Sequence, residues 1–158
     1  MAQNLTMRDL VLPQAVEAAL SVSSKKEVLQ SLAASAASLL GKDQAELFNV
    51  LWERERLGTT GVGQGIAIPH GRVSGLDKVS GFFARLSQPV NFEAIDDKPV
   101  DLIFLLLAPE AAGADHLHAL ATVSRLLRDP KLCEKLRSAK DSSALYRLLT
   151  ETETAQAA

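Results

Sequence analysis

The residues best suited to chemistry lie in one short stretch, GVGQGIAIPHG at residues 61–71, which holds a single histidine, His70. Pro69 fixes its own φ angle and restrains the preceding residue to extended geometry, whereas Gly71 places no side chain beside the imidazole. A neutral imidazole offers a lone pair near pH 7, and a hydrogen bond to its other nitrogen selects the tautomer. These features suit a nucleophile that a phosphoryl group approaches in line. It is equally open that His70 is a turn histidine that only forms a hydrogen bond with the backbone.

Two further histidines lie in the segment 115–128, DHLHALATVSRLLR, which has helical spacing and which we expect Asp115 to cap. The predicted apolar stripe of this helix consists of Leu117, Leu120, Val123 and Leu127. A helix advances by about 100° per residue, so His116 should lie at the edge of the stripe and His118 should face water. Their spacing prevents both from binding one metal ion, and without a cysteine cluster no metal site is expected. His116 is therefore either a second imidazole near His70 or a satisfied boundary histidine.

Charged residues crowd the end of the helix that precedes the glycine-rich stretch. The predicted buried face of this helix consists of Leu47, Phe48, Leu51 and Trp52. Glu53 and Arg56 project away from that face and suit a surface ion pair, whereas Arg54 lies at its flank and Glu55 almost on it. Burying a charge is costly unless it is paired or serves a ligand. Arginine suits phosphate oxygens, so we expect Arg54 to bind phosphate and leave open whether Glu55 pairs with it.

The segment 58–65, GTTGVGQG, is a loop by composition. A dinucleotide fingerprint would need glycine where Ile66 stands, and a P-loop would need Gly-Lys-Ser/Thr, so nucleotide binding is not expected. The simpler interpretation is a flexible turn. The more specific one is a concave anion-binding site formed by backbone N–H groups and threonine hydroxyls. The residues of this predicted phosphate-binding loop are Gly58, Thr59, Thr60, Gly61, Gly63 and Gly71.

The order of the predicted elements indicates an α/β fold. Helices are predicted at 24–40, 43–57, 115–128, 130–139 and 142–151, and strands at 66–68, 79–86 and 100–108. The strand at 100–108, VDLIFLLLA, is typical of a central strand that is buried on both faces. Helices, then strands, then helices favour a sandwich around a mixed sheet. The stretch 87–99 is expected to be a connection.

Composition limits the class of protein. The chain has 158 residues, 47% of them apolar, and a formal net charge of −2, which suits one domain and does not suggest nucleic-acid binding. The N-terminus lacks the layout of a signal peptide, the longest apolar run (102–108) is too short to cross a bilayer, and Cys133 has no partner cysteine. We therefore expect a cytoplasmic protein with no direct membrane insertion, one domain over 1–150 and a frayed tail at 151–158.

The stretches GTTGVGQGIAIPHG, PVDLIFLLLAP and DHLHALATVSRLL resemble the fructose/mannitol-type enzyme IIA domain of the bacterial phosphoenolpyruvate:sugar phosphotransferase system. The resemblance extends from about residue 7 to residue 150, and the signature G-x-G-I-A-I-P-H-G is highly specific. The stretch NFEAIDDKPVDLIF looks most like the nitrogen-regulatory branch of the family. The resemblance implies a mixed sheet of about five strands flanked by helices.

The resemblance also assigns roles to residues. It implies that His70 is phosphorylated at Nε2, as a tele-phosphohistidine, that His116 is the second imidazole near the phosphoryl group, and that Arg54 steadies the phosphate charge. The implied donor is a histidine phosphocarrier protein, itself charged from phosphoenolpyruvate by enzyme I. No metal, nucleotide or other cofactor is implied. Such a chain would be a phosphocarrier rather than an enzyme that turns over a small molecule.

Several functions stay open on the sequence. The first is a phosphotransfer regulator, modified on His70, that acts on regulatory target proteins by contact. The second is a sugar-specific transport component that donates the phosphoryl group to a IIB domain, and the lack of a fused IIB or membrane domain favours the first. A third is a binding module with a structural His70, which the placement of Arg54 and His116 near buried faces disfavours. A histidine-based hydrolase is not favoured, because no G-x-S-x-G or metal motif is present.

Overall fold

The computed structural model describes residues 6–157, with the backbone alone for 152–157, and its strands form one mixed sheet. The strands are β1 (Val11–Leu20), β2 (Gly61–Gly63), β3 (Ile66–Ala67), β4 (His70–Val73), β5 (Ser80–Val90) and β6 (Val100–Pro109). Their order is β1-β5-β6-β3-β2, and β4 also pairs with β6. The pairs β1–β5, β3–β6 and β4–β6 are parallel, whereas β5–β6 and β2–β3 are antiparallel. The α/β class and the mixed sheet predicted from the sequence are confirmed, with six strands in the described part.

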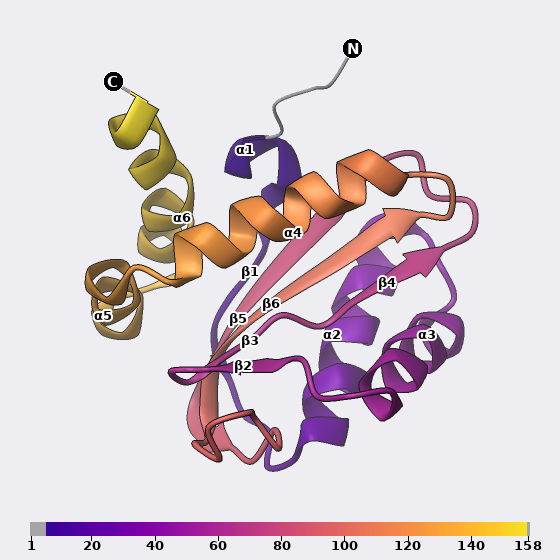
Figure 1. Ribbon diagram of the computed structural model, residues 1–158, viewed down its shortest axis with the longest axis horizontal. Helices are drawn as coiled ribbons and strands as arrows, with labels where there is room; N and C mark the ends of the chain where they lie inside the picture. Colours follow the sequence, from indigo (N-terminus) through magenta and orange to yellow (C-terminus); the bar gives the residue numbers. More distant parts are fainter. Residues whose placement is uncertain (1–5, 158) are drawn as a thin grey trace.

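Helices cover both faces of this sheet. They are α1 (Met7–Leu10), α2 (Lys25–Leu40), α3 (Gln44–Arg56), α4 (Gly113–Leu127), α5 (Pro130–Ser138) and α6 (Ser142–Ala157). In Figure 1, α4 crosses in front of the sheet, whereas α2 lies behind it with α3 beside it. The predicted ends of α2 are confirmed: Ser24 caps its first turn, and Gly41 ends it at φ 66°, a left-handed conformation that glycine adopts readily. No helix in residues 6–157 is long and apolar enough to cross a membrane.

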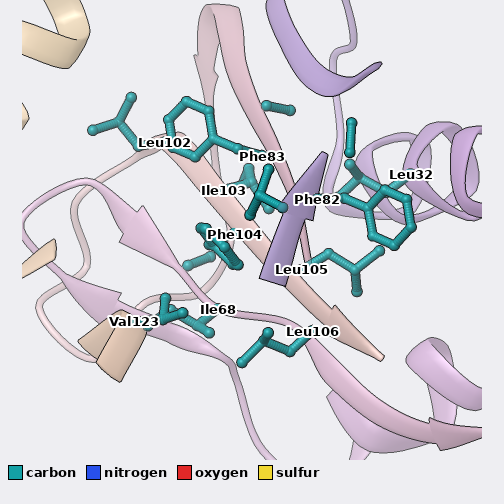
Figure 2. Packing of buried hydrophobic residues seen from close by; sticks show 14 of the residues in the cluster. Leu32, Ile68, Phe82, Phe83, Leu102, Ile103, Phe104, Leu105, Leu106 and Val123 are labelled. Atoms are coloured by element: carbon teal, nitrogen blue, oxygen red, sulfur yellow. The ribbon is translucent and has the colours of Figure 1, made fainter. Parts of the chain in front are cut away.

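Strand β6 is the centre of the core. Each residue from Leu102 to Ala108 is fully buried, because strands lie on both sides of β6 and helices lie over both faces. Figure 2 shows the alternation of its side chains: Leu105 lies with residues of the α2 side, and Phe104 lies toward Ile68 and Val123 on the α4 side. The short strands β3 and β4 are therefore held against a rigid platform.

The N-terminal elements α1 and β1 are absent from the predicted set. Strand β1, VLPQAVEAAL, lacks the alternation of a half-buried strand, since its burial follows no period of two. Its Pro13 is tolerated because β1 is an edge strand, bonded only to β5. Strand β5 continues to Val90, so the first residues of the expected connection at 87–99 belong to the sheet.

Two other expectations about boundaries are corrected by the structure. The expected loop at 58–65 contains β2, which forms a hairpin with β3. Gln64 and Gly65 have φ angles of 60° and 79°, the positive values that a tight hairpin turn needs. Helix α4 begins at Gly113, so Asp115 lies inside its first turn and does not cap it.

The C-terminal helix runs further than expected. Helix α6 continues to Ala157, beyond the predicted end at 151. It therefore overlaps most of the tail that is expected to fray, 151–158, and residue 158 lies outside the described residues.

Candidate functional site

His70 is the first residue of β4, where it lies beside Leu106 of β6. The carbonyl of Pro69 accepts the Leu106 N–H at 2.9 Å, so the chain is tied to β6 immediately before the histidine. The carboxyl ends of parallel strands are where open α/β sheets usually bind ligands. His70 is half-buried at that end, between α3 and α4.

The hydrogen bonds of His70 define its tautomer. Nδ1 lies 2.9 Å from the carbonyl oxygen of Ile68. A carbonyl only accepts, so Nδ1 carries the proton and Nε2 holds the lone pair. Arg54 independently requires the same assignment, since its Nε–H donates to His70 Nε2 at 3.3 Å. The lone pair therefore lies on Nε2, the nitrogen that the family resemblance predicts to be phosphorylated.

Burial keeps the imidazole of His70 neutral. Burial is the largest influence and lowers the pKa of His70 below its usual 6.5, and the bond to Ile68 opposes it. The positive charge of Arg54 lowers the pKa further, and the negative charge of Glu55 raises it. The lone pair at Nε2 is thus available at neutral pH.

His116 lies on the buried face of α4 and is 6% exposed. Its ring meets that of His70 edge to face, with centroids 5.7 Å apart. Burial first, then the charges of His70 and Arg72, lower the pKa of His116. Its Nε2 is the one buried side-chain polar atom without a hydrogen-bond partner among the described residues. Such an atom costs about 1–3 kcal/mol of stability, and an incoming oxygen could satisfy it.

The predicted stripe of α4 is wrong at one end. Leu117 is 67% exposed, whereas Ala119 is fully buried, so the buried face is centred nearer to His116 than predicted. A leucine is expected to be buried because its side chain is large and apolar. At this end of α4, however, the small Ala119 faces the interior and Leu117 faces outward. His118, expected to face water, is half-buried and has no part in the site.

A hollow of about 350 Å³, the His70 pocket, brings the predicted residues together from three elements. Arg54 of α3, His70 and Gly71 of β4 and His116 of α4 all line it. Arg72 lines it too and is absent from the predicted set. The signal for Arg72 was its position two residues after His70, which places both on one side of a strand, but β4 itself is not among the predicted strands.

The predicted phosphate-binding loop is mostly occupied with internal bonds. The hydroxyl of Thr59 donates to the carbonyl of Phe92 at 2.7 Å, and the hydroxyl of Thr60 donates to Glu55 at 2.6 Å. Neither hydroxyl is left to bind an anion. The N–H groups of Gly58 and Gly61 also have partners, the Glu55 carbonyl and the Thr59 hydroxyl.

Two of the loop glycines have roles that differ from the expected one. Gly63 lies in β2, where it pairs with Ile66. Gly71 is not a turn residue, because it lies within β4 and pairs with Leu107. A Cβ at position 71 would lie 2.5 Å from Cγ1 of Val50, so the glycine allows α3 to pack directly on the strand.

The charged residues at the end of α3 divide as predicted, with one addition. Arg56 and Glu53 form the predicted surface ion pair at 2.8 Å. Glu55 does not pair with Arg54: its buried carboxylate accepts from Thr60 and forms an ion pair with Lys25 at 3.1 Å. Lys25 is absent from the predicted set, because nothing in its local sequence indicates a partner 30 residues away.

The chain is similar to known proteins over most of its length. The family described as "Phosphoenolpyruvate-dependent sugar phosphotransferase system, EIIA 2" matches residues 10–152. A nitrogen regulatory protein of Bradyrhizobium diazoefficiens is 55% identical over 145 residues, which cover 92% of this chain and 95% of the relative. The crystal structure of nitrogen regulatory protein IIA-Ntr from Neisseria meningitidis has a TM-score of 0.85 at 34% identity and covers 90% of this chain and 97% of its own.

A further solved structure shares the fold alone. It is the Escherichia coli complex of enzyme IIAMTL with phosphorylated enzyme IIBMTL, with a TM-score of 0.75, 19% identity, and coverage of 90% of this chain and 99% of that one. The chain therefore belongs to the EIIA 2 family of the phosphoenolpyruvate-dependent sugar phosphotransferase system, as a regulatory IIA protein.

Proposed function

We propose that this protein accepts a phosphoryl group on Nε2 of His70 from a histidine phosphocarrier protein. In this proposal, the phosphorylation state then decides which regulatory target proteins it contacts. One observation carries the proposal: the Ile68 carbonyl holds the proton on Nδ1, which leaves the lone pair on Nε2 at the wall of an open pocket. The names of the similar nitrogen regulatory proteins support a regulatory role.

The transfer step is an in-line displacement at phosphorus. The lone pair of His70 Nε2 forms the new N–P bond while the N–P bond of the donor phosphohistidine breaks. The electron pair of the broken bond returns to the donor's imidazole nitrogen. The proton stays on His70 Nδ1, hydrogen-bonded to the Ile68 carbonyl, throughout the step. The acceptor ring therefore needs no change of tautomer.

Arg54 and His116 are suited to stabilise charge in this step. Arg54 now donates its Nε–H to the lone pair that would attack, so the guanidinium must exchange the imidazole for phosphoryl oxygens as the bond forms. His116 Nε2 is buried beside His70 and has no partner in the described chain. Donors held close to the reacting atom stabilise developing charge, and Arg54 stays close because its Nη1 is anchored on the Gly58 carbonyl while its Nε–H changes partner.

The surface around the pocket suits a protein partner. Leu57 lines the pocket and is 86% exposed, and Leu117, next to His116, is 67% exposed. Leu57 lines the pocket together with Arg54, Arg72 and Glu53, so the rim combines an exposed apolar side chain with two positive charges and one negative charge. A phosphoryl group would add about 1.5 to 2 negative charges at its centre, which changes what can dock there. We also propose that the protein works in the cytoplasm, as the sequence analysis expects.

A phosphotransfer assay tests the proposal. Purified protein is mixed with labelled phosphoenolpyruvate, enzyme I and the phosphocarrier, and His70→Ala is compared with His118→Ala. We expect acid-labile, base-stable label on the wild type and on His118→Ala, and none on His70→Ala. His118 is the matched control, because it lies on the same helix as His116 but outside the pocket. Label that persists on His70→Ala would contradict the assignment of His70.

The second candidate function is donation to a sugar-specific IIB domain. It is favoured by the shared fold with the mannitol IIA, which was solved in complex with phosphorylated IIB. The two functions share the first step and differ in the acceptor. Phosphorylated protein is therefore incubated with isolated fructose- and mannitol-type IIB domains. Under our proposal the label stays on His70, and transfer to a IIB cysteine would favour the transport role.

A further inference from the structure

Glu55 is a buried carboxylate whose role the transfer step does not yet explain. It lies in the last turn of α3 and is 6% exposed. Its Oε1 accepts the Thr60 hydroxyl at 2.6 Å, and its Oε2 accepts the Thr60 N–H at 2.9 Å and the Lys25 ammonium at 3.1 Å. A buried charge persists only with such partners, and two of these three bonds are made to one residue.

Thr60 continues the chain of bonds to the reactive imidazole. Its carbonyl accepts the Ile68 N–H at 3.0 Å, and the carbonyl of Ile68 accepts the proton on His70 Nδ1 at 2.9 Å. Thr60 and Ile68 are both almost fully buried. The carboxylate of Glu55 is thus linked to the proton that leaves the lone pair on Nε2.

The same carboxylate also fixes the surroundings of Arg54. By bonding Thr60, Glu55 folds residues 58–60 back onto the end of α3. The carbonyl of Gly58 in this fold accepts from Nη1 of Arg54 at 2.8 Å, while Nε of Arg54 donates to His70. Glu55 is therefore connected, through Thr60 and the fold of residues 58–60, to the partner of each nitrogen of the His70 ring: Ile68 for Nδ1 and Arg54 for Nε2.

We propose that Glu55, acting through Thr60, is a positioning residue that holds His70 with its proton on Nδ1 and its lone pair on Nε2. The consequence for transfer rests on the proposed function, whereas the consequence for the tautomer does not. Lys25 bonds the Glu55 carboxylate but lies outside the path to His70, which runs from Glu55 through Thr60 and Ile68. Its other partners are Glu93 at 3.0 Å and the Phe92 ring at 5.3 Å. An ion pair that served stability alone would have no effect on which nitrogen of His70 carries the proton.

The test compares the tautomer, the phosphorylation rate and the stability of four variants. Glu55→Gln keeps the shape but removes the charge, Thr60→Val removes the hydroxyl, Thr60→Ser keeps it, and Lys25→Met removes the ammonium with its ion pairs to Glu55 and Glu93. Nitrogen-15 NMR of the His70 ring reports the tautomer, and single-turnover phosphorylation at equal folded concentration reports the rate. Urea unfolding measures the stability of each variant.

We expect Glu55→Gln and Thr60→Val to populate the tautomer with the proton on Nε2 and to accept the phosphoryl group about tenfold more slowly. Thr60→Ser should match the wild type in tautomer and rate. Lys25→Met should keep the wild-type tautomer and rate although it loses stability. The proposal is overturned if Glu55→Gln and Thr60→Val keep the wild-type tautomer. A wild type that accepts no phosphoryl group would instead refute the proposed function, and the tautomer comparison would still decide this inference.

Discussion

Arg54 and His70 form a resting pair in which each side chain satisfies the other. The Nε–H of Arg54 occupies the lone pair of His70 Nε2, and Nη1 of Arg54 is anchored on the Gly58 carbonyl. The anchored end fixes the guanidinium near the position that a phosphoryl group would take. Arginine presents several donors in a planar fork, which allows it to keep one bond while it changes another.

Replacing Arg54 should therefore affect transfer much more than stability. We expect Arg54→Ala to slow phosphorylation of His70 by about 100-fold, the usual effect of removing one donor to developing charge. The control is Arg56→Ala, two residues along α3, which removes only the exposed ion pair with Glu53. Single-turnover labelling measures both. Equal rates for the two variants would show that Arg54 does not stabilise the transferred group.

The lowered pKa of His70 predicts the pH dependence of both transfer and stability. Its pKa in the folded state lies below 6.5, so the folded ring stays neutral at a pH where a free histidine is already half protonated. Stability from this group is complete above pH 6.5 and is lost as pH falls through the lower, folded-state pKa, because the unfolded chain binds the proton first. The pKa of His116 is lowered too, and adds to the effect in the same direction.

We expect the phosphorylation rate to stay constant as pH is lowered through 6.5 and to fall only below it. The NMR titration of the His70 ring in the folded protein should have its midpoint below that of the urea-unfolded chain. A midpoint at or above the unfolded value would show that burial does not control this imidazole.

At the scale of elements, the site depends on how closely α3 approaches β4. Gly71 and Val50 are the point of contact, since a Cβ on Gly71 would lie 2.5 Å from Val50 Cγ1. Valine is stiff at its β-branched carbon, so room for a side chain at position 71 requires the Val50 side chain, or α3 with it, to shift. A shift of α3 would carry Arg54 away from His70.

Gly71→Ala should lower stability by about 1–3 kcal/mol and slow phosphorylation in the protein that remains folded. Removing the clashing methyl groups in Gly71→Ala/Val50→Ala should recover part of both losses, which a double-mutant cycle in urea would show as a favourable coupling. Gly113→Ala is the matched control, because a Cβ there meets nothing within 4 Å. Additive losses in the double variant would contradict a direct contact.

At the scale of the whole molecule, Arg85 joins the sheet to the C-terminal helices. Its Nε donates to the Ala18 carbonyl of β1 at 2.9 Å, and its Nη1 donates to the carbonyls of Leu136 and Ala139 at the end of α5. Helix ends leave carbonyls without intrahelical partners, and a cation is well suited to satisfy them. This half-buried guanidinium thus connects three parts of the chain at a distance from the His70 pocket.

Arg85→Ala should lower the free energy of unfolding by about 2–3 kcal/mol, because several carbonyls lose a charged donor. Arg85→Lys should recover only part of the loss, since an ammonium cannot reach β1 and α5 in the same geometry. Urea denaturation gives the energies, and the rate of His70 labelling per folded molecule should match the wild type. A slower rate would show that this region is coupled to the pocket.

Local patterns in the sequence predict the main elements of this fold and indicate several residues that line the His70 pocket. The caps at Ser24 and Gly41 and the apolar run of β6 act within a few residues, so the ends of α2 and the central strand are confirmed. His70 is singled out because the proline before it restricts the backbone and the glycine after it places no side chain beside the imidazole. The roles of Thr60 and Lys25 depend on their contacts with Glu55. These contacts form only when the segment after α3 and the start of α2 meet at the end of α3, and no local pattern encodes them.

Strand β1 and the phase of α4 show a second limit of local patterns. An edge strand with a proline has no alternating signature, and a small residue such as Ala119 gives little signal of burial although it is fully buried. Both are determined by the space that neighbouring elements leave. Tertiary packing therefore decides these features, and it is visible only when the elements are assembled.

The complete burial of β6 has a consequence for how a signal could leave the site. A backbone tied to that strand immediately before His70 has little freedom to move. Under the proposed function, a target would therefore sense the phosphoryl group by touching the pocket itself, as the donor does. Donor and targets would then occupy the site in turn. An excess of any target should delay the next phosphorylation. The phosphorylated fraction of the protein would therefore depend on the supply of phosphoryl groups relative to the amount of target protein.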